Sequence, residues 1–401
     1  MVIAGEMPGA RLGARTLPLG ITPMPGEELE SWLAALAQSL DLQWSKLLGM
    51  ILPPSRPSER NWISLLNLTA HLTAAELRCI SAATGVQTAC IEALTWRRFD
   101  GLIGTVDVVR RHMKMAWPLG RSRFCPACLA NSHGRWQLEW QLPWVFACQK
   151  HFRLLADSCP ACGRNQRIGR GWLRGDLVPA PESCGTAQPD GTRCGRLLSA
   201  ASTISLPEGH PFLQAQAAVS AVLSDTTVTA GLYRTMPAPT TQFLADLRLL
   251  ASRFATGTAL YEPEMLSLFH PDGHFMGAAD SFEVRRWLAA PNKRRTVPAL
   301  MAAVGISSAL TVLRCDTVDE AAALLRPLIT ARRGAGKAVT TGALTTKNRN
   351  PVIDATTVRA LRDSMGPLDQ LRRRAWEPAP QLPRKMQTSV LRNIPTRLWK
   401  D

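Results

Sequence analysis

The chain has 401 residues, of which 46% are hydrophobic, and it carries 47 basic against 31 acidic residues, a formal net charge of +16. This length exceeds what a single hydrophobic core usually holds, so we expect two or three domains. The sequence has neither a charge-free run of eighteen apolar residues nor an apolar signal-peptide segment near its start. These absences argue against a transmembrane helix and a secretory signal, and we expect a cytoplasmic protein without a membrane partner.

The positive charge is concentrated in two segments. Residues 121–200 contain eleven basic and five acidic residues, and residues 332–401 contain fifteen and five. Such an excess favours a polyanionic partner, usually nucleic acid, although a solvated basic surface would have the same composition. In the second segment we predict phosphate contacts to DNA, without sequence selectivity, by Arg372, Arg373, Arg374, Arg384 and Lys385.

Two amphipathic helices are predicted near the start of the chain. Apolar residues recur at helical spacing between 29 and 40, and Glu27 and Glu28 precede them, where acidic side chains favour a helix N-terminus. A second, short helix is predicted over 45–52, and Pro53 ends it.

A pair of helices separated by a glycine follows. Thr73 and Glu76 have the spacing of a capping box, so a helix should begin there and end at Gly85. A further helix should run through Ile91. Together with Ser81 these residues resemble a helix-turn-helix, which would either read DNA or serve as a plain packing unit.

Helical periodicity returns in the second half. We predict helices over 211–223, 240–254, 282–288, 297–304 and 318–329, with a second helix-turn-helix around Gly305, and further helices over 355–365 and 367–376. The predicted fold class is mainly α, with a helix-turn-helix-like N-terminal region, a central double zinc-finger segment and a helical C-terminal domain. The expected regions are 1–120, 121–200, 201–331 and a basic linker and tail over 332–401.

Seven of the ten cysteines lie between positions 125 and 194. With one histidine close by, they include three pairs of donors separated by two residues, the spacing of zinc-binding knuckles. Eight donors in this segment suffice for two closed tetrahedral zinc sites: Cys125, Cys128, Cys148, His151, Cys159, Cys162, Cys184 and Cys194. The first four and the last four could form separate sites, or the pairs could alternate between two ions.

Other uses of these cysteines fit less well. A reducing cytoplasm disfavours disulfides, a redox CxxC is expected beside a βαβ unit, and iron–sulfur clusters usually take cysteines alone. Catalytic zinc keeps one coordination position open, whereas each of these sites has four protein donors. The segment around Lys337 lacks the spacing of a Walker motif, and no other catalytic motif is recognisable, so we expect two structural Zn²⁺ ions and no enzyme activity.

The stretch FCPACLANSHGRWQLEWQLPWVFACQKHFRLLADSCPACG resembles the TniQ family of transposition proteins. The shared features are a CPxC knuckle, a Trp-rich middle, a CxxH pair followed by two leucines, and a CPxCG knuckle. The segment PGEELESWLAALA is similar to the opening helix of the family. The resemblance covers about residues 20–200 and extends only loosely beyond them.

The resemblance implies that Cys125, Cys128, Cys148, His151, Cys159 and Cys162 bind zinc. It also implies a bacterial, nucleoid-associated adaptor without catalytic activity, which links target DNA or a target-recognition complex to an AAA+ ATPase and a transposase complex. A separate target-recognition protein, an RNA-guided complex and a homodimer are further partners that the family suggests. The alternative is a zinc-containing transcription regulator that binds a specific DNA sequence.

Overall fold

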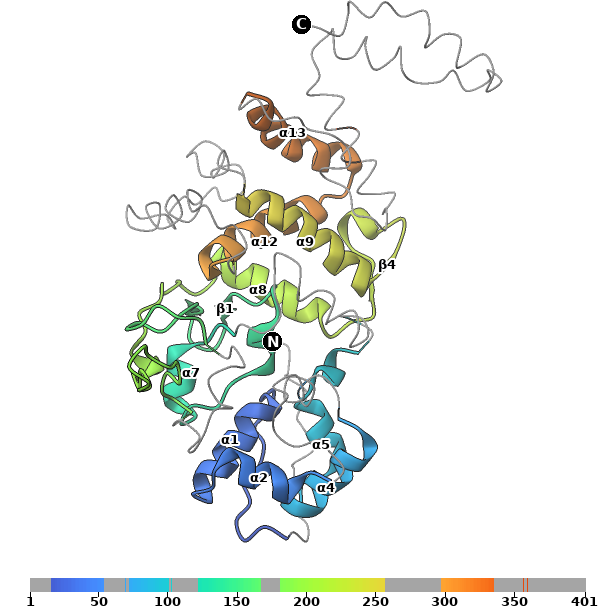
Figure 1. Ribbon diagram of the computed structural model, residues 1–401. Helices are drawn as coiled ribbons and strands as arrows, with labels where there is room; N and C mark the ends of the chain where they lie inside the picture. Colours follow the sequence, from blue (N-terminus) through green and yellow to red (C-terminus); the bar gives the residue numbers. More distant parts are fainter. Residues whose placement is uncertain are drawn as a thin grey trace, which may run out of the picture.

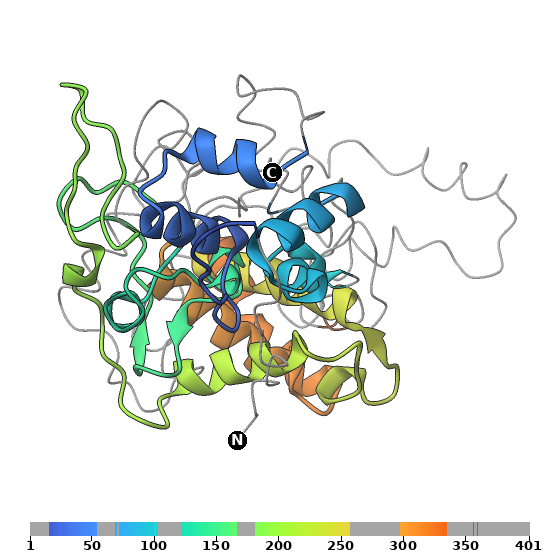
Figure 2. The same cartoon turned by 90° about the horizontal axis from the view of Figure 1, so that it is seen from below.

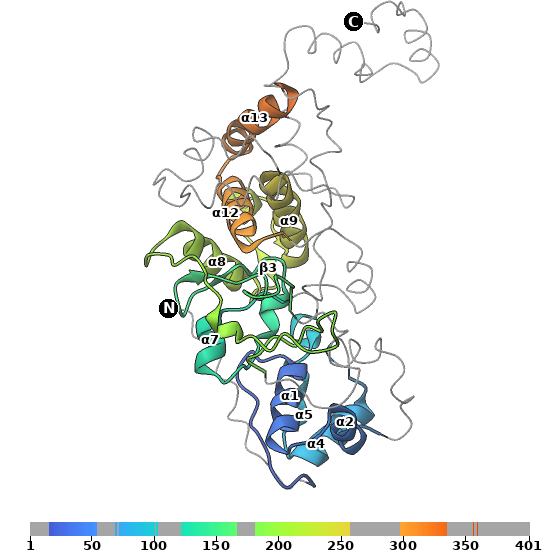
Figure 3. The ribbon, with the colours of Figure 1, turned by 60° about the vertical axis from the view of Figure 1, so that its left-hand side comes forward.

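The computed structural model describes residues 16–53, 69, 72–100, 102, 122–166, 181–256, 297–334, 356 and 359. In this part of the chain the protein is helix-rich, with two short two-stranded sheets, which confirms the predicted fold class. Figures 1 and 3 show the N-terminal helices at one end, the central segment beside them and the C-terminal helices beyond it. Figure 2 looks from the N-terminal end, where α1, α2, α4 and α5 lie in front.

The described residues of the N-terminal region contain four α-helices: α1 (Leu29–Ser39), α2 (Trp44–Ile51), α4 (Ala74–Thr84) and α5 (Thr88–Ala93). The capping box of α4 is present, since Thr73 accepts from the Glu76 amide while the Glu76 carboxylate accepts from the Thr73 amide. Gly85 ends this helix in the left-handed conformation, with φ 74°. Local sequence chemistry therefore defines the ends of α4 as predicted.

The central segment contains little regular structure. It comprises α7 (Pro126–Asn131), which begins immediately after Cys125, and the hairpin of β1 (Ala147–Cys148) and β2 (Arg153–Leu154). Short 3-10 helices lie at Trp96–Phe99, Leu138–Gln141 and Leu198–Ala200. The first pair of donors therefore lies at the start of α7 and in its first turn, and the second pair lies at the end of β1 and in the hairpin turn.

The C-terminal region is built from α8 (Pro211–Val222), α9 (Thr240–Thr256), α12 (Ala299–Leu313) and α13 (Val318–Gly334). A small hairpin of β3 (Thr227–Val228) and β4 (Ala238–Pro239) and a 3-10 helix at Gly231–Tyr233 separate α8 from α9. The predicted turn at Gly305 is wrong, because α12 continues through it. Gly305 is buried in a helix that packs along α9, and this burial outweighs the weak helix propensity of glycine.

The buried apolar side chains form two clusters. One lies within the N-terminal region and contains Leu29, Trp32 and Ile91. The other includes side chains from the central segment, such as Phe124 and Trp136, together with those of α8, α9, α12 and α13. The central segment, which is too small to bury a large core alone, therefore shares its core with the C-terminal helices.

The predicted helices over 282–288 and 367–376, and nearly all of 355–365, lie outside the described residues, as do Arg372, Arg373, Arg374, Arg384 and Lys385. Among the residues that the structure describes, none of the helices is both long and apolar enough to span a membrane.

Candidate metal centres

The first group of donors, which we call site one, consists of Cys125, Cys128, Cys148 and His151. Cys125 precedes α7 and Cys128 lies within it, while Cys148 is the last residue of β1 and His151 lies in the turn between β1 and β2. The Nδ1 atom of His151 lies 3.5 Å from Cys125 Sγ, 3.2 Å from Cys128 Sγ and 3.5 Å from Cys148 Sγ. Helix and hairpin thus present four donors to one point.

The second group, site two, consists of Cys159, Cys162, Cys184 and Cys194. Cys159 Sγ lies 3.8 Å from Cys194 Sγ, and Cys162 Sγ lies 3.7 Å from Cys184 Sγ. Both groups follow the order of the sequence. The structure therefore has the sequential grouping of donors, not the interleaved one.

The spacing within both groups fits a tetrahedral zinc ion. Two sulfurs, each about 2.3 Å from such an ion, lie about 3.8 Å apart, and a sulfur and an imidazole nitrogen lie slightly closer together. The distances above match this geometry, and in each group all four donor atoms lie within 4.8 Å of one another. A Cys₃His and a Cys₄ donor set are both typical of structural zinc.

The pKa values of the thiols also reflect how close the sulfur atoms of each site lie to one another. Hydrogen bonds from the Cys128 and Cys148 side chains lower the pKa of Cys125 to about 3, and the Cys125 side chain raises the pKa of Cys128. At site two, burial raises the pKa of Cys159 to about 12. Neighbouring sulfurs compete for ionisation, so a divalent cation would let them be thiolates together.

Polar side chains contact one donor in each site, Cys184 in site two and His151 in site one. Gln166 Nε2 donates to Cys184 Sγ at 3.4 Å, and the Thr186 hydroxyl lies 3.2 Å from the same sulfur. Burial opposes ionisation of Cys184, but the hydrogen bonds with Thr186 and Gln166 prevail and lower its pKa to about 7. The side chain of Asn131, at the end of α7, lies 3.0 Å from Nε2 of His151. If Nδ1 binds a metal ion, Nε2 carries the proton and the Asn131 amide oxygen should face it.

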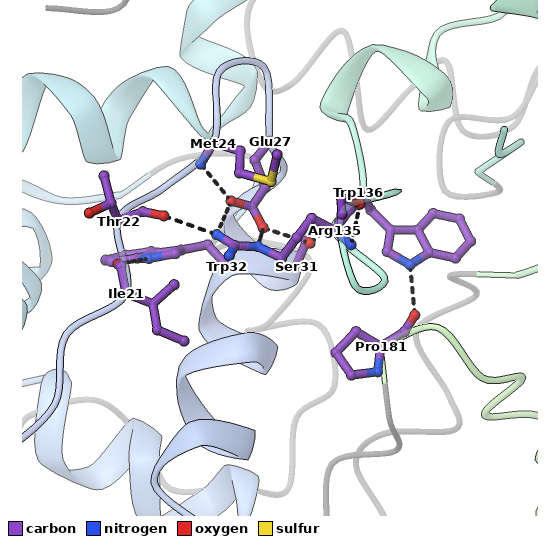
Figure 4. Close-up of polar contacts among 10 residues, drawn as sticks. Ile21, Thr22, Met24, Glu27, Ser31, Trp32, Arg135, Trp136 and Pro181 are labelled. Carbon is purple, nitrogen blue, oxygen red and sulfur yellow. Dashed lines mark hydrogen bonds and ion pairs between the residues drawn. The ribbon is translucent and has the colours of Figure 1, made fainter. Parts of the chain in front are cut away.

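A buried ion pair joins site one to the N-terminal helices (Figure 4). Arg135, which follows α7, donates from Nε and a terminal nitrogen to the two carboxylate oxygens of Glu27. Glu27 is fully buried, and it also accepts from Ser31 Oγ at 2.8 Å and from the Met24 amide at 2.9 Å. Sequence reasoning assigned Glu27 only to a helix start, because its partner is 108 residues away.

The adjoining turn connects both candidate sites. The Trp136 amide donates to Ser31 Oγ at 2.8 Å, and its indole Nε1 donates to the Pro181 carbonyl at 3.1 Å, close to Cys184 of site two (Figure 4). Gly134 has φ 80°, and a Cβ atom there would collide with the backbone of Pro181 and Glu182. Residues 134–136 therefore form a joint between α1, site one and site two.

Two further contacts attach the C-terminal helices. Buried Arg123 bonds Asp157 at 3.2 Å and the Val297 carbonyl at 2.8 Å, while Asp157 accepts from the Ala299 amide at the start of α12. Burial raises the pKa of Asp157, against the effect of Arg123. On α8, the Gln216 side-chain oxygen accepts from the amides of Phe146 and Ala147, next to Cys148.

The turn of site one contains an exposed aromatic residue in an unusual conformation. Phe152 follows His151, has φ 47° and exposes 43% of its surface. A side chain other than glycine in the left-handed region costs about 1–2 kcal/mol. The sequence did not point to Phe152, because a positive φ at a residue other than glycine cannot be read from the amino-acid sequence.

A model of the TniQ family matches residues 18–155. This segment begins before α1, contains all four donors of site one and ends just before the first donor of site two. No curated protein matches the sequence. Residues 18–155 are therefore similar to the TniQ domain, which is the part of the chain that this comparison covers.

Proposed function

We propose that the chain is a non-catalytic adaptor that connects target DNA, or a target-recognition complex, to an AAA+ ATPase and its transposase. A TniQ domain implies a general role in selecting transposition targets, and the match over residues 18–155 is the observation that carries the proposal. The link to an ATPase is the finer part of the proposal and needs its own test.

We further propose that sites one and two each hold a structural Zn²⁺ ion. Four protein donors per site leave no coordination position for water or substrate, which suits a scaffold. Through the joint at residues 134–136, the two ions would fix how the N-terminal helices sit relative to the central segment. Such a frame can present one surface to the ATPase and another to DNA.

A transcription regulator that reads an operator is less well supported. The second helix of the helix-turn-helix-like pair, α5, contains neither lysine nor arginine, and its Glu92 pairs with Arg97. Readers of the major groove usually present basic or amide side chains from that helix. We therefore propose that DNA affinity arises elsewhere, including the tail residues Arg372, Arg373, Arg374, Arg384 and Lys385.

Transposition in cells tests the adaptor role. A marked mini-transposon is supplied with a transposase and an AAA+ ATPase of one transposition system, with and without this chain, and the insertion sites are sequenced. We expect that targeted insertions need the chain. Unchanged insertion sites and frequency in its absence would contradict the proposal.

Two assays on the purified chain separate the alternatives. DNA cleavage or joining in Mg²⁺ would reveal an enzyme. Tight binding to one short DNA sequence, selected from a random pool without any partner protein, would identify a regulator. The adaptor proposal expects neither result.

A further inference from the structure

Phe152 directly follows a donor pair, at a position that is glycine after two other donor pairs of the same chain. The residue that follows the second donor has a positive φ in three of them: 65° at Gly163, 63° at Gly195 and 47° at Phe152. The left-handed conformation therefore recurs after three of the four donor pairs, and glycine adopts it without strain. Phenylalanine adds strain at this position, and its exposed ring recovers little burial in return.

The backbone around Phe152 is held firmly. Its carbonyl accepts from the Leu206 amide at 2.7 Å, and Leu154 donates to the Ile204 carbonyl at 2.9 Å, so residues 204–206 run beside β2. Arg153 also donates from Nε to the His151 carbonyl at 3.4 Å. Strained residues persist where the surrounding structure determines them in this way, and such residues often have a functional role.

The charged residues closest to Phe152 in the sequence are positive. Lys150 is exposed and Arg153 is half-buried, so cations lie on both sides of Phe152 in the sequence. The two acidic residues of the segment 122–166, Glu139 and Asp157, are half-buried, and Asp157 is paired with Arg123. An exposed aromatic ring between cations is typical of surfaces that bind unpaired nucleotides.

We propose that Phe152, Lys150 and Arg153 form a contact site for nucleic acid with unpaired bases. The ring would stack on one base while the two cations contact the flanking phosphates. The inference deepens the proposed function and rests on its nucleic-acid contact, but it needs neither the ATPase nor the transposase. Because Lys150 and Arg153 are positively charged, they favour a partner that carries phosphate groups over a protein surface with few acidic residues.

The test is fluorescence anisotropy of the zinc-loaded full chain with a labelled single strand of mixed sequence and with the matching duplex. Phe152→Gly should weaken single-strand binding about 5- to 100-fold, the range expected for loss of one stacked base. Its melting temperature should stay the same or rise, because glycine suits the turn. Phe152→Trp should preserve binding.

Two more variants sharpen the result. Met236→Ser, which removes an apolar side chain of similar exposure (50%) from the C-terminal region, should leave the affinity unchanged. Lys150→Gln should reduce the slope of log affinity against log salt concentration by about 0.7, the value for one phosphate contact on a single strand.

Unchanged binding by Phe152→Gly would overturn the inference, and so would a fall in its melting temperature, since the ring would then have a structural role. A wild-type chain that binds no single strand would overturn it as well. The adaptor role would remain to be judged by the transposition assay, so the two proposals can fail separately.

Discussion

Glu27→Gln tests whether the buried ion pair holds the N-terminal helices to site one. Glutamine keeps the shape of the side chain but removes its charge, so the guanidinium of Arg135, with a side chain only 10% exposed, loses its counter-ion. Breaking a buried pair by removing one partner typically costs about 3–5 kcal/mol. We expect a loss of about 3 kcal/mol, since one of the two donors, Ser31 Oγ on Oε1 or the Met24 amide on Oε2, can still bond the single amide oxygen.

Hydrogen exchange at two backbone bonds across the joint measures this loss. The Glu28 amide donates to the Trp136 carbonyl and the Leu138 amide donates to the Gly26 carbonyl, both at 2.9 Å. If these amides exchange through local opening of the joint, a loss of 3 kcal/mol speeds exchange about a hundredfold.

Arg97→Ala is the matched control, because it breaks an exposed pair in which the side chains of Arg97 and Glu92 are 42% and 36% accessible. Such pairs contribute at most about 1 kcal/mol, which limits the acceleration to about fivefold. Equal exchange at the joint in Glu27→Gln and Arg97→Ala would refute the reasoning.

Three further predictions concern the candidate sites. The purified chain should contain two zinc ions by elemental analysis; Cys125→Ser should lose one of them and expose the central segment to protease, whereas Cys79→Ser, outside both sites, should not. Asn131→Ala should weaken zinc at site one on the order of tenfold in a chelator competition, and Asn131→Asp should not. Gly134→Ala should lower the melting temperature more than Gly191→Ala, because both have a positive φ but a Cβ at Gly191 meets no neighbour; equal effects would contradict the close packing at the joint.

Much of the fold follows from local sequence signals. The capping box at Thr73 and Glu76, the terminating Gly85 and the apolar periodicity of α1 predicted their elements to within a few residues. The donor spacing likewise predicted which residues the structure brings together. These signals succeed because each acts within a single turn, helix or knuckle.

The remaining features depend on contacts between distant segments. The pairing of Glu27 with Arg135 and the attachment of Asp157 to the start of α12 span 108 and 142 residues, so no local pattern encodes them. Gly305 misled the prediction for a related reason: its weak helix propensity is visible in the sequence, but its burial against α9 is not. The strain at Phe152 likewise becomes visible only in the backbone angles.

The bond network of Gln216 has a mechanical consequence. Its single side-chain oxygen accepts from two consecutive amides, those of Phe146 just before β1 and of Ala147 within it, at 2.8 and 3.2 Å. A partner that pulls on α8 would therefore transmit its load directly to the hairpin of site one. A force applied to α8 would therefore act on site one before it acted on the N-terminal helices.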